Sequence, residues 1–145
     1  MTSIKKTYCQ FYFAFIIFLL IPFSSFSQIK IKAVGDIMLG SVTPKTVLPA
    51  DSGKIFVKSI SGYLNDADIV FGNFEGTFIL DGFQPKKCSE PARTKERCFE
   101  FGMPDYLAPI ISKLHINVLN LDNNHSNDYG KEGSDFTQNK LKELN

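Results

Sequence analysis

Three short clusters of polar residues stand out because each comes at the end of an apolar segment. Asp36 belongs to the first cluster, Asn73 and Glu75 to the second, and Asn124 and His125 to the third. Carboxylate and carboxamide oxygens suit Mg and Mn, and imidazole suits Zn, Fe and Mn. If the fold brings the three clusters together, they predict a metal-binding or phosphate-binding site.

Each of these residues also has an ordinary structural explanation. Asp36 could cap a turn or a helix, and Glu75 could face solvent in a loop. Asn124 could simply adopt a left-handed turn conformation, and a single histidine such as His125 is often structural. We interpret His115, at the end of a helical face, as structural. It is the coincidence of three clusters that favours a functional site.

The apolar segments before these clusters have the pattern of buried strands, because they are short, rich in β-branched residues and bounded by turn formers. The predicted strands are residues 29–34, 67–73 and 117–121. Apolar residues at helical spacing predict three helices, the second of them opened by a proline. The predicted helices are residues 53–65, 104–114 and 133–144. This alternation predicts an α/β fold with a mainly parallel sheet covered by helices.

The predicted topology places all three polar clusters at one edge of the sheet. Ligands of parallel α/β sheets bind at the carboxyl ends of the strands, where these clusters lie. Residues 76–103 do not fit the alternation, and we interpret them as a long insertion that carries two cysteines. Loops of this length in compact domains are usually functional or specially cross-linked.

Three motifs in this order resemble the signatures of the CapA-like capsule-synthesis proteins. The motifs are GDIMLG at 35–40, ADIVFGNFEG at 67–76, and NNH at 123–125 followed by DYG at 128–130. That family is associated with poly-γ-glutamate capsule formation and belongs to the calcineurin-like metallophosphatase superfamily. The resemblance covers nearly all of residues 29–145, and it implies an incomplete metallophosphatase fold of the order β-α-β-α-β-α.

The resemblance also implies roles for individual residues. The implied metal ligands are Asp36, Asn73, Glu75 and Asn124. His125 would protonate the leaving group or bind the phosphate, and we infer that Asp128 orients His125, as carboxylates commonly do for imidazoles. Two divalent ions (Mn, Fe, Zn or Mg) would clamp the phosphate oxygens and generate a hydroxide.

The sequence departs from the family pattern at several points. Met38 stands where the usual phosphatase pattern has a histidine, and Asp122 stands where a small residue usually precedes the paired asparagines. The chain has two histidines in all. The resemblance implies that relatives continue past residue 145 with further histidine motifs. We therefore expect a truncated N-terminal part of a longer domain, with weak metal binding and negligible hydrolysis on its own.

The N-terminus has the pattern of a secretory signal peptide. Two lysines precede 13 apolar residues at 11–23, and a serine-rich stretch follows. We predict cleavage before Gln28, which divides the chain into a signal peptide at 1–27 and one domain at 28–145; an uncleaved membrane anchor is the alternative. The protein would then be exported to the periplasm, the cell envelope or the extracellular space.

Charge and cysteines narrow the function further. The mature part has 14 Lys and Arg (16 less the two in the signal peptide) against 15 Asp and Glu, so no basic field predicts nucleic-acid binding. Cys88 and Cys98 are the cysteines left after cleavage, and in an exported chain they predict a disulfide. A zinc site is the alternative, but no histidine or third cysteine lies nearby in sequence.

Two functions from different classes remain. The first is a metal-dependent phosphoesterase acting in capsule or cell-envelope polymer synthesis. The second is a non-catalytic accessory protein that binds an anionic polymer or a membrane capsule-synthesis complex. A serine esterase is disfavoured because Ile37, not serine, follows Asp36, and the chain has no Gly-x-Ser-x-Gly motif.

Overall fold

The computed structural model describes residues 27–144 and has the predicted α/β architecture with parallel strands. The main sheet has the order β1-β2-β5, in which β1 is Ile31–Ile37, β2 is Ile69–Phe74 and β5 is Val118–Asn120. Both pairings are parallel, so the carboxyl ends of all three strands lie at one edge. The predicted signal peptide lies almost entirely outside the described residues. Within residues 27–144, no helix has the length and apolar character needed to cross a membrane.

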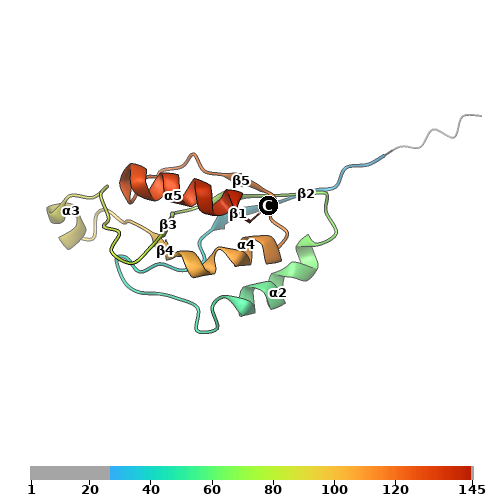
Figure 1. Ribbon diagram of the computed structural model, residues 1–145, viewed down its shortest axis with the longest axis horizontal. Helices are drawn as coiled ribbons and strands as arrows, with labels where there is room; N and C mark the ends of the chain where they lie inside the picture. Colours follow the sequence, from blue (N-terminus) through green and yellow to red (C-terminus); the bar gives the residue numbers. More distant parts are fainter. Residues whose placement is uncertain (1–26, 145) are drawn as a thin grey trace, which may run out of the picture.

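The main core lies between the sheet and two helices that follow its first two strands. Helix α2 (Lys54–Leu64) contacts α4 (Pro109–Lys113), and the two lie next to each other below the strands in Figure 1. Buried side chains from both helices and from β1 and β2 form one cluster, which includes Leu64, Val70, Phe74, Ile110 and Ile111. The spacing of apolar residues predicted the buried side chains of α4, whereas in α2 only Leu64 is buried and apolar residues such as Ile55 are exposed.

The second predicted helix begins later than expected. Residues Gly102–Pro104 form strand β4, Asp105–Leu107 form a short 3-10 turn, and α4 begins only at Pro109. Pro109 has no N–H to donate to the carbonyl of Asp105, so a continuous α-helix from 104 onward would lose that hydrogen bond. A proline is well placed at the first position of a helix, which is where α4 puts it.

The segment at 76–103 is part of the fold, so its interpretation as a simple insertion was wrong. Strand β3 (Thr77–Ile79) pairs in parallel with β4 to make a second, two-stranded sheet. Phe78 and Met103 from these strands are fully buried. Three-residue strands are too short to give a recognisable sequence period, and only their packing reveals them.

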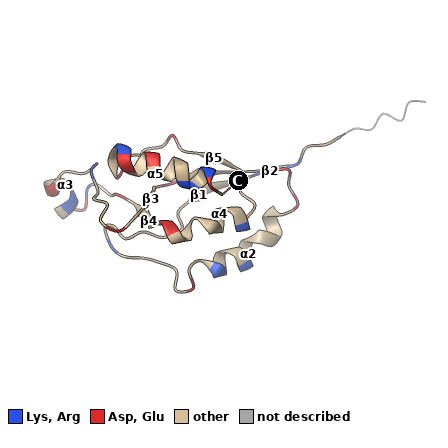
Figure 2. Ribbon diagram, in the orientation of Figure 1, with Lys and Arg blue, Asp and Glu red and all other residues tan. Residues whose placement is uncertain are grey.

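Residues 80–101, between these two strands, form an arm that contains helix α3 (Glu90–Thr94). Helix α3 stands apart at the left of Figure 1. Cys88 and Cys98 are joined by a disulfide across this arm, with their Cα atoms 5.8 Å apart. Acidic and basic residues are mixed over the ribbon (Figure 2) and do not separate into two halves.

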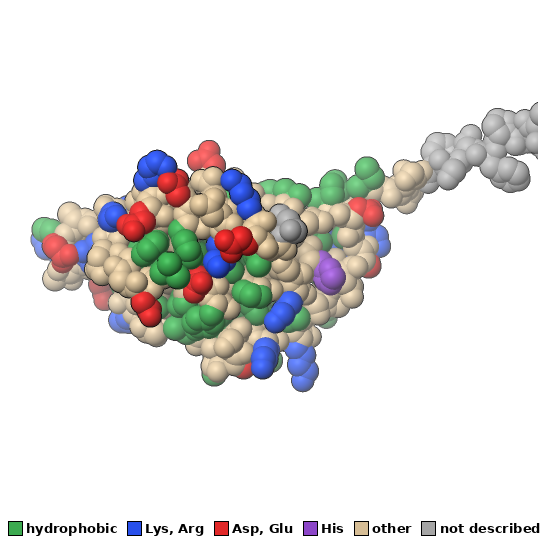
Figure 3. Space-filling model, in the orientation of Figure 1, with side chains coloured by type: hydrophobic (Ala, Val, Ile, Leu, Met, Phe, Trp, Pro, Cys, Tyr) green, Lys and Arg blue, Asp and Glu red, His purple; other side chains and the backbone are tan. Residues whose placement is uncertain are grey.

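The last helix, α5 (Gly130–Lys142), packs closely on β3. A Cβ atom at Gly133 would lie 2.7 Å from Thr77 Cγ2, so glycine is required for this approach. The Thr137 hydroxyl accepts a hydrogen bond of 2.8 Å from the Phe78 main-chain N–H. On the face seen in Figure 3, hydrophobic side chains collect between charged ones. Helix α5 fixes the end of the preceding loop, which carries the third polar cluster.

Candidate functional site

A row of three polar side chains crosses the carboxyl edge of the main sheet. Asp36 in β1 is in register with Asn73 in β2, and Asn73 is in register with Asn120 in β5. Asn73 Nδ2 donates to Asp36 Oδ1 at 2.8 Å, and Asn120 Nδ2 donates to Asn73 Oδ1 at 2.8 Å. The parallel register therefore brings together residues that are far apart in sequence.

The Asn73 amide is at the centre of this edge, and its hydrogen bonds fix its orientation. Its Nδ2 also donates to Glu75 Oε2 at 2.8 Å, and its Oδ1 also accepts from Asn123 Nδ2 at 3.0 Å. Carboxylates only accept hydrogen bonds, so the NH₂ end of Asn73 must face Asp36 and Glu75. Asn73 thus holds two carboxylates beside one another.

The loop after β5 is tied to β2 through Asn123. Asn123 Nδ2 donates to the Phe74 carbonyl at 2.9 Å, and Asn123 Oδ1 accepts from the His125 main-chain N–H at 2.9 Å. A side-chain oxygen that binds the N–H two residues on is a typical Asx turn. This turn presents His125 to the carboxyl edge of the sheet.

His125 lies between two carboxylates. Its Nδ1 is 2.7 Å from Asp128 Oδ2, and its Nε2 is 3.7 Å from Glu75 Oε1. The Phe101 ring packs against the imidazole with 4.4 Å between ring centroids. The His125 side chain is 12% exposed, whereas that of Asp128 is completely buried. Asp128 therefore holds one nitrogen of the ring, and the other nitrogen points toward Glu75.

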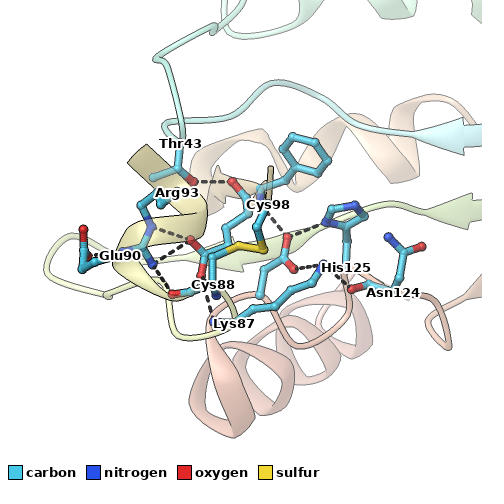
Figure 4. Close-up of a disulfide and its surroundings, with 11 residues drawn as sticks. Thr43, Lys87, Cys88, Glu90, Arg93, Cys98, Asn124 and His125 are labelled. Atoms are coloured by element: carbon cyan, nitrogen blue, oxygen red, sulfur yellow. Dashed lines mark hydrogen bonds and ion pairs between the residues drawn. A yellow bond between two sulfur atoms is a disulfide. The ribbon is translucent and has the colours of Figure 1, made fainter. Parts of the chain in front are cut away.

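Asn124 has a different position from its neighbours. It is exposed, and its main-chain carbonyl accepts a hydrogen bond of 2.7 Å from Lys87 Nζ. Figure 4 shows the Asn124 amide pointing away from this contact. The structure thus brings Asp36, Asn73, Glu75 and His125 together, and metal coordination by Asn124 stays a prediction.

The described residues supply only part of a metal site. Asp36, Glu75 and His125 are of the right chemical types, but the Asn73 NH₂ group occupies the position between the two carboxylates. Within residues 27–144, no group of three His, Cys, Asp or Glu side chains is arranged to hold a metal ion. These donors do not fit a complete metal centre, so we derive no chemical step through a metal.

Tyr129 is next to Asp128 and is buried on the same side of the site. Its hydroxyl lies 2.9 Å from Thr43 Oγ1, which itself donates to the Glu100 carbonyl at 2.6 Å. Burial raises the pKa of Tyr129, and the hydrogen bond with Thr43 opposes this shift in part. The phenol therefore stays neutral at physiological pH and serves as a donor.

Sequence reasoning missed three residues that build the site, namely Lys87, Asn120 and Asn123. Asn120 is the last residue of its strand, as Asp36 and Asn73 are near the ends of theirs, and this shared position was an available signal. Asn123 belongs to the NNH motif, but no role of its own was predicted for it. Lys87 precedes Cys88 in the arm, and nothing in the sequence relates it to a loop 37 residues away.

Comparison with known proteins identifies the family. A family model described as Bacterial capsule synthesis protein PGA_cap matches residues 30–145. The Capsule biosynthesis protein CapA of Bacillus anthracis is 30% identical over 116 residues, which are 80% of this chain and 26% of that protein. The chain thus spans about a quarter of the length of this curated relative. No solved structure matches. The chain belongs to the bacterial capsule synthesis protein family PGA_cap.

Proposed function

We propose that this chain forms part of a hydrolytic site of the phosphoesterase type in an exported protein of capsule or cell-envelope polymer synthesis. The observation that carries the proposal is the orientation of His125, whose Nδ1 is bound to buried Asp128 while Nε2 faces the Glu75 carboxylate. A carboxylate that fixes one imidazole nitrogen leaves the other free for proton transfer. His125 would act through Nε2, which accepts a proton in the neutral ring and can then give that proton to the leaving group.

The substrate would be held at the sheet edge next to this nitrogen. Asp36 is exposed and Glu75 is partly exposed, so both can meet a ligand without rearrangement of the core. Their negative charges repel a phosphate group, so an anionic substrate requires a cation here. We therefore retain divalent metal binding (Mn, Fe, Zn or Mg) by Asp36, Asn73, Glu75 and Asn124 as a proposal for the whole protein, which would need further ligands.

Export and a polymer partner are parts of the same proposal. The Cys88–Cys98 disulfide suits an oxidising compartment, and the apolar run at 11–23 suits a signal peptide. A periplasmic, cell-envelope or extracellular location would give access to an anionic capsule polymer such as poly-γ-glutamate, or to a membrane capsule-synthesis complex.

A second candidate is a non-catalytic accessory protein that binds the polymer or a synthase. The observation that favours it is the Asn73 amide, whose NH₂ donates to both carboxylates and fills the space between them. Met38 in place of a histidine removes one further ligand of the usual phosphatase pattern.

The test is hydrolysis of a phosphodiester and a phosphomonoester by the natural full-length polypeptide, with each of the four metals added in turn. We expect His125→Ala to lower kcat by about 10²–10⁴-fold, the usual contribution of a general acid or base. His115→Ala is the matched control, because His115 is exposed and precedes β5, whereas the loop that carries His125 follows β5. If wild type and His125→Ala hydrolyse equally, the role of His125 is wrong. If neither shows turnover while polymer binding is measurable, the accessory function replaces the enzyme.

A further inference from the structure

The Asp128 carboxylate is buried, and its own loop supplies only His125 as a side-chain partner among the described residues. Its Oδ2 accepts from the Phe101 main-chain N–H and lies against His125 Nδ1, both at 2.7 Å. Its Oδ1 accepts no hydrogen bond from the described residues, and Lys87 Nζ forms an ion pair with it at 3.1 Å. A buried carboxylate without a compensating cation is costly. The ammonium of Lys87 balances this negative charge.

Lys87 makes a second contact in the same loop. Its ammonium donates to the carbonyl of Asn124 at 2.7 Å, and Asn124 directly precedes His125 in the chain. One ammonium thereby connects the carboxylate that binds the imidazole to the main chain that carries it. Figure 4 shows Lys87 reaching this loop from its position beside the disulfide.

The arm in turn fixes Lys87. Glu100 Oε1 accepts hydrogen bonds of 2.8 Å from the N–H groups of both Lys87 and Cys88. Arg93 binds the other oxygen of Glu100, with Nε at 2.9 Å. The Cys88–Cys98 bond closes the arm between Lys87 on one side and Glu100 on the other. Both parts of the arm that flank the disulfide reach the site. Lys87 contacts Asp128 on one side, and Phe101 contacts His125 and Asp128 on the other.

We propose that Lys87 is a positioning residue which, held by the disulfide-closed arm, fixes the Asp128–His125 pair with the proton on Nδ1 and the lone pair on Nε2. A carboxylate oxygen can only accept, so an Asp128 locked in this position selects the Nδ1–H tautomer. Without Lys87, Oδ1 has no charged partner and the carboxylate can turn toward solvent. The inference rests on the proposed function for its importance, but the geometry it describes is independent of turnover.

The test is the nitrogen spectrum of the two histidine rings, recorded by two-bond ¹H–¹⁵N NMR at pH 8 on oxidised protein. In wild type we expect His125 to show one tautomer with the proton on Nδ1, while exposed His115 serves as internal reference. Lys87→Met should move the two His125 ring nitrogens toward the averaged shifts of a ring that exchanges between tautomers. Lys87→Arg, which keeps the charge and the donors, should restore the wild-type pattern.

Lys86→Met is the matched control. Lys86 is the adjacent lysine, but its ammonium pairs with Glu132 on the surface at 3.0 Å and not with Asp128. The His125 pattern should be unchanged in this variant. If Lys87→Met does not fold, as judged by its amide spectrum, the comparison of Lys87→Gln with Lys87→Arg replaces it.

A kinetic readout separates this inference from the proposed function. In the full-length enzyme, loss of a residue that orients a catalytic group through another side chain should lower kcat about 10–100-fold with little change in KM. If no variant shows hydrolysis but the His125 pattern follows Lys87, the enzyme proposal fails and the positioning role stands. An unchanged His125 tautomer in folded Lys87→Met overturns the positioning role, whatever the activity.

Discussion

The two sides of the site are built in opposite ways. On the closed side, Asp128 is buried, and Lys87, Phe101 and His125 surround it. On the open side, the Asp36 carboxylate is exposed, and its contact with the rest of the site is a single hydrogen bond from Asn73. The same type of side chain is thus locked on one side and accessible on the other.

The difference follows from the cost of burying charge. A carboxylate removed from water needs hydrogen bonds and a cation to replace its hydration, so its position is dictated by its partners. An exposed carboxylate keeps its water and can exchange it for a ligand. The closed side is therefore suited to orient a ring, and the open side to receive a ligand or cation.

The largest expected effect on stability comes from Asp128→Ala, compared with the same substitution at Asp36. Asp128→Ala leaves the Phe101 N–H unpaired and Lys87 without its partner, and we expect a loss of about 3–5 kcal/mol in the free energy of unfolding. Asp36→Ala, an exposed residue of the same type, should stay within about 0.5 kcal/mol of wild type. Urea unfolding of the oxidised proteins measures both.

Equal losses in these two variants would contradict the division into a closed and an open side. Asp128→Asn is a useful third protein, because it can still accept the Phe101 hydrogen bond but cannot balance the charge of Lys87. Its free energy of unfolding should lie between those of wild type and Asp128→Ala.

A smaller effect is expected from opening the arm. The disulfide closes a loop with a sequence separation of 10 residues, for which chain entropy predicts a stabilisation of about 2–3 kcal/mol. The double variant Cys88→Ser/Cys98→Ser should lose this amount in urea unfolding. A thiol-reducing agent should have no effect on the double variant but should bring wild type to the same value; if it leaves wild-type stability unchanged, the disulfide does not support the closed side.

The smallest effect concerns Tyr129 and pH. Burial raises the pKa of this phenol in the folded state above its ordinary value of 10.0. The folded protein therefore holds the phenol proton more tightly than the unfolded chain, so this contribution to stability is complete below pH 10.0 and is lost as the pH rises through the raised value.

Tyr129→Phe should consequently lose about 1 kcal/mol at neutral pH, through the missing hydrogen bond with Thr43, and should show a weaker decline in stability above pH 10.0. Tyr63→Phe is the control, because Tyr63 is 75% exposed. Parallel alkaline declines in wild type and Tyr129→Phe would show that Tyr129 does not contribute to the pH dependence.

Local patterns in the sequence predicted the frame of the sheet well. The strands around residues 31–37, 69–74 and 118–120 and the helix at Lys54–Leu64 were recognisable because each has a clear apolar period and distinct ends. Parallel order then placed Asp36, Asn73 and Glu75 at one edge. Strand β1 extends further than predicted, so that Asp36 is in the strand and in register with Asn73.

The parts that were not predicted depend on contacts between distant segments. Strands β3 and β4 have three residues each, too few for a period, and they are defined by pairing with one another. Between two adjacent asparagines, the sequence cannot show which one turns inward, and the structure turns Asn123 toward Asn73.

The sequence by itself determined the family, the parallel α/β frame and the edge at which the polar residues gather, because these follow from periodicity and motif order along the chain. Only the tertiary structure decided that Lys87, in the disulfide-closed arm, balances the buried charge of Asp128. The physical reason is that the cost of a buried carboxylate depends on which groups surround it in space. Two of the partners of Asp128, Phe101 and Lys87, are 27 and 41 residues away in the chain, and the sequence pattern does not encode their approach.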